Sequence, residues 1–266
     1  MKNNLSSAAL ITALLFSACG DLPVTPDLGR QTLNAQDGWG AATSGTTGGA
    51  TANSEHIFTV TNRAELINAL GNGDATPKII YVKGLINANV DDENQPLTCA
   101  DYAAPGYTLN AYLNAYDPAT WGRTKKPSGT LEDARKASQV NQAKRMKINV
   151  SPNTSIIGLG RNSGFIGTSL MIEKVDNVIL RNLVIQDAAD CFPAWDPTDG
   201  ASGNWNSEYD LVSVVTATHV WVNQVAFSDG DNLDANQPLY FGRPYQVHDG
   251  ALDLSTRQFR EALCRK

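Results

Sequence analysis

The 266-residue sequence is poor in basic and histidine side chains and has no long apolar run. Its 21 Lys and Arg against 27 Asp and Glu give a net charge of −6, whereas nucleic-acid-binding proteins need a basic surface. The three histidines are not spaced as zinc ligands, and no serine lies in a nucleophile elbow. The glycines between Gly158 and Gly164 lack the spacing of a dinucleotide-binding loop. These absences leave acidic side chains as the main candidate functional groups.

The N-terminus has the pattern of a targeting segment. Lys2 precedes an apolar run at 8–16 that is too short to span a membrane and fits a secretory signal. The run ends in FSACG at 16–20, which favours a lipoprotein signal in which Cys19 is lipidated; cleavage near Ala18 would instead release a soluble protein. Both readings predict an extracytoplasmic protein, either secreted or anchored to the outer membrane by lipid.

Cysteine usage agrees with export, because disulfides form outside the cytoplasm. Cys99 and Cys191 both fall in the region that we expect to fold, and they could pair. Pairing requires their Cα atoms to lie within about 7 Å, which a sequence does not reveal, so two buried thiols are the alternative. Cys264 is predicted to be a free thiol near the C-terminus.

Residue composition and pattern divide the chain into a signal at 1–19, a linker at 20–36, a folded domain at 37–254 and a basic tail at 255–266 that is predicted to be helical. Within the domain, strands are expected at 57–60 and 78–82. A capping-box pattern starting at Asn62 and a stop at Gly71 predict a short helix between these strands. Residues 91–147 are polar and predict a long excursion with one or two helices.

An internal repeat follows the excursion. The sequence NVILRNLVIQD at 177–187 aligns with HVWVNQVAFSD at 219–229, an offset of 219 − 177 = 42. The aliphatic pair at 156–157 precedes its counterpart at 178–179 by 22. A period of about 21–22 residues predicts the stacked coils of a parallel β-helix. A β-sandwich is disfavoured because the runs lack Asn-Gly hairpin turns.

Three carboxylates stand out near the C-terminus: Asp210, Asp249 and Asp253. The last two are four residues apart, so in a strand their side chains would lie on the same face. Hard oxygen ligands on one rigid face suit Ca²⁺. The alternative is that these are turn aspartates that bind no ion, since Asp is common in turns.

Several motifs resemble those of bacterial pectate lyases of polysaccharide lyase family 1. The resemblance covers about residues 37–254. It rests on GTTGG at 45–49, LTCADY at 97–102, NTSIIG at 153–158, FPAWDPTDG at 192–200, WNSEYD at 205–210, YFGRPYQ at 240–246 and HDG at 248–250.

The resemblance implies an all-β, right-handed parallel β-helix with an N-terminal helical cap. It also implies a monomeric enzyme that cleaves polygalacturonate (pectate) by Ca²⁺-dependent β-elimination. By motif, Asp210, Asp249 and Asp253 match the family's Ca²⁺ ligands. A bridging Ca²⁺ would also allow an acidic protein to bind an acidic polymer.

The sequence departs from the family after Leu254. The resemblance implies further coils and a catalytic arginine there, but residues 255–266 match neither, so the β-helix is expected to be incomplete and no catalytic residue is assigned. Two hypotheses follow. Either another group takes the place of the arginine in an active lyase, or the chain is a non-catalytic remnant that binds only Ca²⁺ and pectate.

Overall fold

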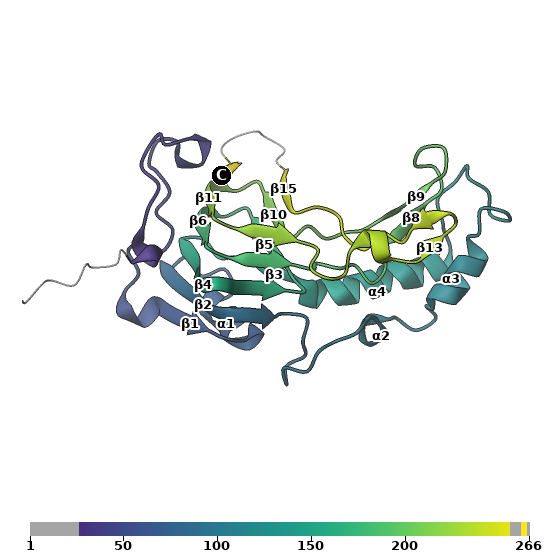
Figure 1. The fold of residues 1–266 in the computed structure, drawn as a ribbon, viewed down its shortest axis with the longest axis horizontal. Helices are drawn as coiled ribbons and strands as arrows, with labels where there is room; N and C mark the ends of the chain where they lie inside the picture. The colour runs from purple at the N-terminus through teal and green to yellow at the C-terminus, as the bar shows by residue number, and fades with distance from the viewer. Residues whose placement is uncertain (1–26, 256–261, 265–266) are drawn as a thin grey trace, which may run out of the picture.

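The computed structural model describes residues 27–255 and 262–264, and its dominant feature is a stack of parallel strands (Figure 1). One sheet has the order β1-β2-β4-β6-β11-β16 and a second has the order β15-β10-β5-β3. The first sheet contains β1 (Ile57–Val60), β2 (Lys78–Asn87), β4 (Thr154–Ile166), β6 (Asp176–Arg181), β11 (Thr218–Asn223) and β16 (Ala262–Cys264). The second contains β3 (Lys147–Asn149), β5 (Ser169–Glu173), β10 (Val212–Val215) and β15 (Leu252–Ser255).

The chain passes between the two sheets in a repeating order, which makes each repeat a coil. A coil enters through the second sheet, continues into the first, and ends in a short third segment. In successive coils this third segment is the C-terminal part of β4, β7 (Val184–Gln186) and β12 (Ala226–Ser228). All of these pairs are parallel, which excludes the sandwich and makes the fold a parallel β-helix.

The strand register confirms one predicted repeat and corrects the other. Val178 pairs with Val220, an offset of 220 − 178 = 42, as the alignment predicted. Ile156, however, pairs with Leu180, an offset of 180 − 156 = 24 instead of 22. A shift of two residues keeps the same side chains facing the core, so a pattern of aliphatic residues does not distinguish the two registers.

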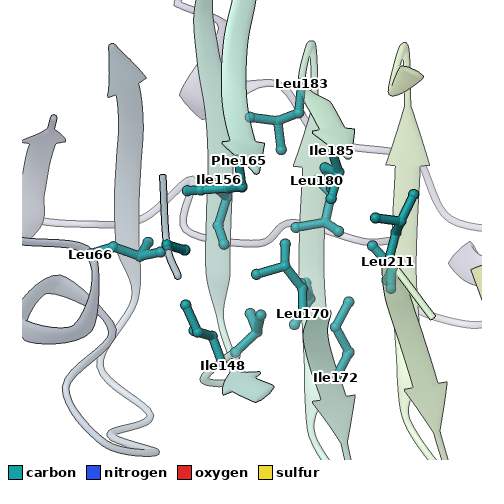
Figure 2. Close-up of a cluster of buried hydrophobic side chains, with 14 of the residues drawn as sticks. Leu66, Ile148, Ile156, Phe165, Leu170, Ile172, Leu180, Leu183, Ile185 and Leu211 are labelled. Atoms are coloured by element: carbon teal, nitrogen blue, oxygen red, sulfur yellow. The ribbon is translucent and has the colours of Figure 1, made fainter. Parts of the chain in front are cut away.

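The core lies inside the coils and is almost entirely aliphatic (Figure 2). Ile156, Leu180 and Ile185 are fully buried, as is Leu170 from the second sheet. Because equivalent positions stack in register, each coil covers the apolar face of the coil before it. The core therefore grows by repetition along the axis of the β-helix.

Single residues in left-handed conformation bend the chain near the ends of strands β6 and β11. Asn177 and Asn182 have φ of 68° and 53°, and their equivalents His219 and Gln224 have φ of 50° and 53°. Asparagine favours this conformation more than most residues do. The Asn182 side chain also donates a hydrogen bond to the Gly158 carbonyl of the preceding coil, at 2.7 Å.

Within residues 27–255, three excursions interrupt the coils, and all three leave between the third segment and the second sheet. They span 88–146, 187–211 and 229–251. The first carries α2 (Cys99–Tyr102), α3 (Leu109–Ala115) and α4 (Thr130–Met146), three helices where one or two were expected. The second carries β8 (Ala194–Asp196) and β9 (Asn204–Asn206), and the third carries η4 (Asp234–Asn236), β13 (Leu239–Tyr240) and β14 (Arg243–Pro244).

The three excursions pack together into a second body beside the coils, which we call the side lobe (Figure 1). Its core is aromatic and draws on all three excursions, with Tyr112, Trp205 and Tyr245 as central members. The first two excursions are also linked by a disulfide between Cys99 and Cys191, whose Cα atoms are 5.3 Å apart.

The side lobe also buries an ion pair. Both guanidinium contacts from Arg135 to the Glu132 carboxylate measure 2.9 Å, and Arg135 donates a further hydrogen bond to the Phe192 carbonyl at 2.6 Å. Tyr112 completes the group by donating its hydroxyl to Glu132 at 2.9 Å. This network ties α4 to both α3 and the second excursion.

The N-terminal part begins as predicted. β1 is followed by α1 (Arg63–Leu70), whose first turn is capped by the Asn62 side chain and whose C-cap is Gly71 in left-handed conformation. Leu66 and Leu70 of α1 pack against the aliphatic core. That this helix caps the end of the stack remains a prediction.

The described part of the predicted linker is packed against the β-helix. Residues 27–56 contain η1 (Leu28–Arg30), η2 (Trp39–Ala41) and η3 (Ser54–His56). Leu28 and Leu33 cover Ile157, Ile179 and Trp221 on the outer face of the first sheet. Apolar side chains at these two positions supply the contacts that a free tether would lack.

The tail also differs from its prediction where the structure describes it. Ala262–Cys264 forms β16, which pairs in parallel with β11 and places Ala262 beside Val220. The offset of 262 − 220 = 42 repeats the spacing of the previous coil, so these residues are a strand and the expected helix is wrong here. Across residues 27–255 and 262–264, no helix combines the length and apolarity needed to cross a bilayer.

Candidate functional site

The three predicted carboxylates lie where two excursions return to the second sheet. Asp210 lies near the end of the second excursion, shortly before β10, and Asp249 lies near the end of the third, shortly before β15. Asp253 lies within β15, directly beside Ser213 of β10. Asp249 is not part of the strand, so the expected alternation along one strand does not explain its position.

Close packing of the two excursion ends brings Asp210 against the turn that follows Asp249. The Leu211 amide donates to the Gly250 carbonyl at 3.0 Å, and Ser213 donates its hydroxyl to the Asp210 carboxylate at 3.3 Å. A Cβ atom on Gly250 would lie 2.4 Å from Asp210 Oδ1, so a side chain there would displace the carboxylate. Gly250 thus permits the approach of the two segments.

The carboxylates perturb one another electrostatically. Burial and the charges of Asp249 and Asp253 raise the pKa of Asp210 above its ordinary value. Burial and the charges of Asp253 and Glu208 likewise raise the pKa of Asp249. Among the described residues, no lysine, arginine or histidine forms an ion pair with Asp210, Asp249 or Asp253. The group is therefore a concentration of negative charge at the junction of coil and side lobe.

The carboxylates are neighbours but do not form a closed coordination shell. Within the part of the chain that the structure describes, no three acidic, histidine or cysteine side chains have the geometry of a formed metal centre. The donor set is nevertheless made only of oxygen atoms and comes from two adjacent coils, which suits a flexible cation such as Ca²⁺.

Sequence reasoning missed His248, the neighbour of Asp249. Its side chain is buried, and its two ring nitrogens lie 3.0 Å from Asp187 Oδ1 and 3.2 Å from Asp234 Oδ1. Burial opposes the charged form, but the hydrogen bond to Asp187 and the charges of Asp229 and Asp234 prevail and raise the pKa of His248. The HDG motif was a signal for this position, but its partners lie on distant segments.

Sequence reasoning also missed Asp190, which is only 1% exposed. Its carboxylate accepts hydrogen bonds from the Phe192 amide at 2.7 Å, the Gln139 side chain at 2.9 Å and the Glu208 amide at 3.1 Å. Burial outweighs these bonds and raises the pKa of Asp190 to about 6. No sequence pattern marked this residue, because it is distinguished only by what surrounds it.

The remaining predicted residues are cysteines. Cys99 and Cys191 form the disulfide of the side lobe. Cys19 lies outside the described residues, so its lipidation stays a prediction. The side chain of Cys264 is likewise outside what the structure describes.

Comparison with known proteins identifies the family to which this chain belongs. A family model described as pectate lyase matches residues 7–103 and 126–257. The chain belongs to the pectate lyase family. It is 51% identical over 247 residues to a pectate lyase of Bacillus subtilis (strain 168), covering 92% of this chain and 58% of the relative.

Solved structures of pectate lyases share the fold. A Bacillus subtilis pectate lyase mutant superposes with a TM-score of 0.83 at 51% identity, over 86% of this chain and 57% of the other. A structure described as pectate lyase bound to hexasaccharide has the same TM-score, identity and coverage. This family member therefore spans between half and two thirds of the length of these relatives.

Proposed function

We propose that this protein acts on polygalacturonate as a Ca²⁺-dependent pectate lyase. The observation that carries the proposal is the coincidence of the family match with a carboxylate cluster at the return of two excursions. The similar structure described as bound to hexasaccharide supports a saccharide polymer as the ligand class.

The residues present fit a bound Ca²⁺. Asp210, Asp249 and Asp253 would hold the ion, because all three offer carboxylate oxygens, and burial together with neighbouring negative charge raises the pKa of the first two. When bound, Ca²⁺ would withdraw charge from a uronate carboxylate and make the adjacent carbon-bound proton more acidic. Gly250 and Ser213 would keep Asp210 oriented toward the other two carboxylates.

The proton-abstracting group is left unassigned. The family's arginine has no matched motif within this sequence, so the residues named above are given roles in binding and orientation only. The competing proposal, a remnant that binds Ca²⁺ and pectate without cleaving it, uses the same carboxylates.

We further propose that the protein is exported and monomeric, with lipidation at Cys19 as the anchor. The Cys99–Cys191 disulfide supports an oxidising compartment. Mass spectrometry of membrane and culture fractions would test the anchor, since a mass without diacylglycerol on the mature N-terminus would contradict it.

The decisive experiment is a lyase assay on polygalacturonate, read as ultraviolet absorbance of the unsaturated product, with Ca²⁺ and with chelator. We expect activity that chelator abolishes. Asp210→Asn should lower Ca²⁺ affinity more than about tenfold, because it removes one charged ligand. Asp133→Asn, on an exposed position of α4, is the matched control. A folded protein that binds pectate in the presence of Ca²⁺ but forms no unsaturated product would favour the binding-only alternative.

A further inference from the structure

Asp190 is a buried carboxylate that is not among the proposed Ca²⁺ ligands. It lies where the second excursion leaves the coils, beside the disulfide cysteine Cys191, and it is almost completely buried. A buried carboxylate is costly unless its oxygens are satisfied by hydrogen bonds. The identity of its partners therefore indicates what the residue is for.

Those partners come from all three excursions. Gln139 belongs to α4 of the first, and Glu208 lies near the end of the second. The Asp190 amide also donates to the carbonyl of Val247, near the end of the third, at 2.7 Å. In the described chain, Asp190, on the outgoing end of the second excursion, thus contacts the returning parts of all three excursions.

Two of these contacts are placed symmetrically with respect to the carboxylate cluster. Glu208 precedes Asp210 by two residues, and Val247 precedes Asp249 by two residues. Asp190 bonds to the backbone at both positions, through its carboxylate on one side and its own amide on the other. Backbone anchors this close to two carboxylates limit how far the carboxylates can move relative to each other.

We propose that Asp190 is a positioning residue that sets the spacing between Asp210 and Asp249. The use of that spacing, Ca²⁺ binding, rests on the proposed function. Ligands contributed by separate segments must be held within about 0.5 Å of a productive geometry, and hydrogen bonds behind them commonly change metal affinity about 10- to 100-fold. Asp190 supplies this support through its contacts with the backbone at Glu208 and Val247, each two residues before a proposed ligand.

The test variant is Asp190→Asn combined with Gln139→Glu. The carboxylate introduced on α4 would accept a hydrogen bond from the new amide nitrogen, which restores the contact with α4 and leaves the amide oxygen on Phe192. The same amide nitrogen then faces the Glu208 amide, so two donors meet and the Glu208 anchor is lost. Gln139→Ala is the matched control, because it removes the α4 contact and keeps the Glu208 anchor.

The first readout is hydrogen exchange in the metal-free protein, which does not depend on Ca²⁺ or on activity. In the double variant we expect exchange at least about tenfold faster in peptides covering 206–211, where the Glu208 anchor is lost, while Gln139→Ala keeps the parent rate there. Parent-like exchange in the double variant would overturn the proposal. If the double variant does not fold, Asp190→Asn alone, which keeps the side-chain volume, is judged by the same criterion.

The second readout is Ca²⁺ affinity by calorimetric titration. We expect about a tenfold loss in the double variant and less than about a twofold change in Gln139→Ala. Equal losses in both would overturn the proposal, since the effect would then come from the side lobe as a whole. Failure of the parent to bind Ca²⁺ would count against the proposed function, whereas the exchange experiment judges Asp190 by itself.

Discussion

The coils and the side lobe are stabilised in different ways. In the coils, aliphatic residues stack in register, so each position is covered by its equivalent one coil away. In the side lobe, aromatic rings, the Glu132–Arg135 pair and one disulfide join residues that have no equivalents elsewhere. The coils therefore depend on a repeated aliphatic pattern, whereas the side lobe depends on contacts between particular residues.

The carboxylate cluster lies where these two regions meet. Asp253 belongs to a coil strand, while Asp210 and Asp249 lie on the returning ends of side-lobe excursions. The coil therefore sets the position of one carboxylate, and the packing of the side lobe sets the positions of the other two. Loosening the side lobe should disturb the site before it disturbs the coils.

Of the changes that test the difference between coils and side lobe, removing the disulfide should have the largest effect. Cys99 and Cys191 are separated by 92 residues. In the chain-entropy model, a disulfide that closes a loop of this size stabilises the folded state by about 4–5 kcal/mol. In the double variant Cys99→Ala with Cys191→Ala, we expect the side lobe to unfold in a separate transition at a lower temperature than the coils. Near-ultraviolet circular dichroism of its aromatic rings would measure that transition. Reductant should have no further effect on the double variant. A single transition at the parent temperature would contradict the distinction.

Breaking the buried ion pair should have the next largest effect. Arg135→Met leaves the Glu132 charge buried without its partner, at a cost of about 3–5 kcal/mol. Adding Glu132→Gln should recover much of that loss in urea unfolding, because it removes the stranded charge. Lys136→Met is the control: Lys136 reaches the same carboxylate at 3.7 Å but is exposed, so its effect should be under about 1 kcal/mol.

Truncating a core side chain should test the coils. Leu180 is fully buried between Ile156 and Val222 of the adjacent strands, so Leu180→Ala should cost about 3 kcal/mol through lost burial and a cavity. Because the side lobe rests on the coils, both regions should melt together in differential scanning calorimetry. Leu159→Ala, at a side chain 44% exposed, should change little. Early loss of the side lobe alone in Leu180→Ala would reverse the proposed dependence.

The smallest effect concerns pH at the junction. Asp190 has a folded pKa of about 6 against an ordinary value of 3.8, so the folded state binds its proton more tightly. Its contribution to stability is then complete below pH 3.8 and is lost as the pH rises through about 6, with an upper limit of about 3 kcal/mol. Urea unfolding at pH 4 and pH 7 should show the parent losing stability relative to Asp190→Asn. Parallel pH profiles for the two proteins would be inconsistent with the raised pKa.

Much of the coil was predictable because its signals are local. The cap at Asn62, the stop at Gly71 and the alternating aliphatic residues around Val178 and Val220 each act through nearby backbone or a regular spacing. The register of Ile156 was mispredicted because two candidate pairings bury the same face. The strand at Ala262–Cys264 was missed because a charged segment masked a repeat that continues at the same offset.

The site was predictable only in part. Asp210, Asp249 and Asp253 were found through motifs, and the structure places them as electrostatic neighbours. Asp190 carries no sequence signal, and the HDG motif marks His248 without indicating its role, because each residue has a hydrogen-bond partner more than forty residues away in the chain. Buried polar residues of this kind become evident only when the distant segments are assembled.

By itself, the sequence determined the class of fold, the repeat of the last coils and the acidic residues available for binding. A regular apolar pattern specifies which face of a strand is buried, and that is enough to specify a stack of coils. Only the tertiary structure decided the exact pairing of the strands, the gathering of three excursions into one side lobe and the contacts of Asp190 with the backbone at Glu208 and Val247. These depend on contacts between segments far apart in the chain, and such contacts leave no periodic trace in the sequence.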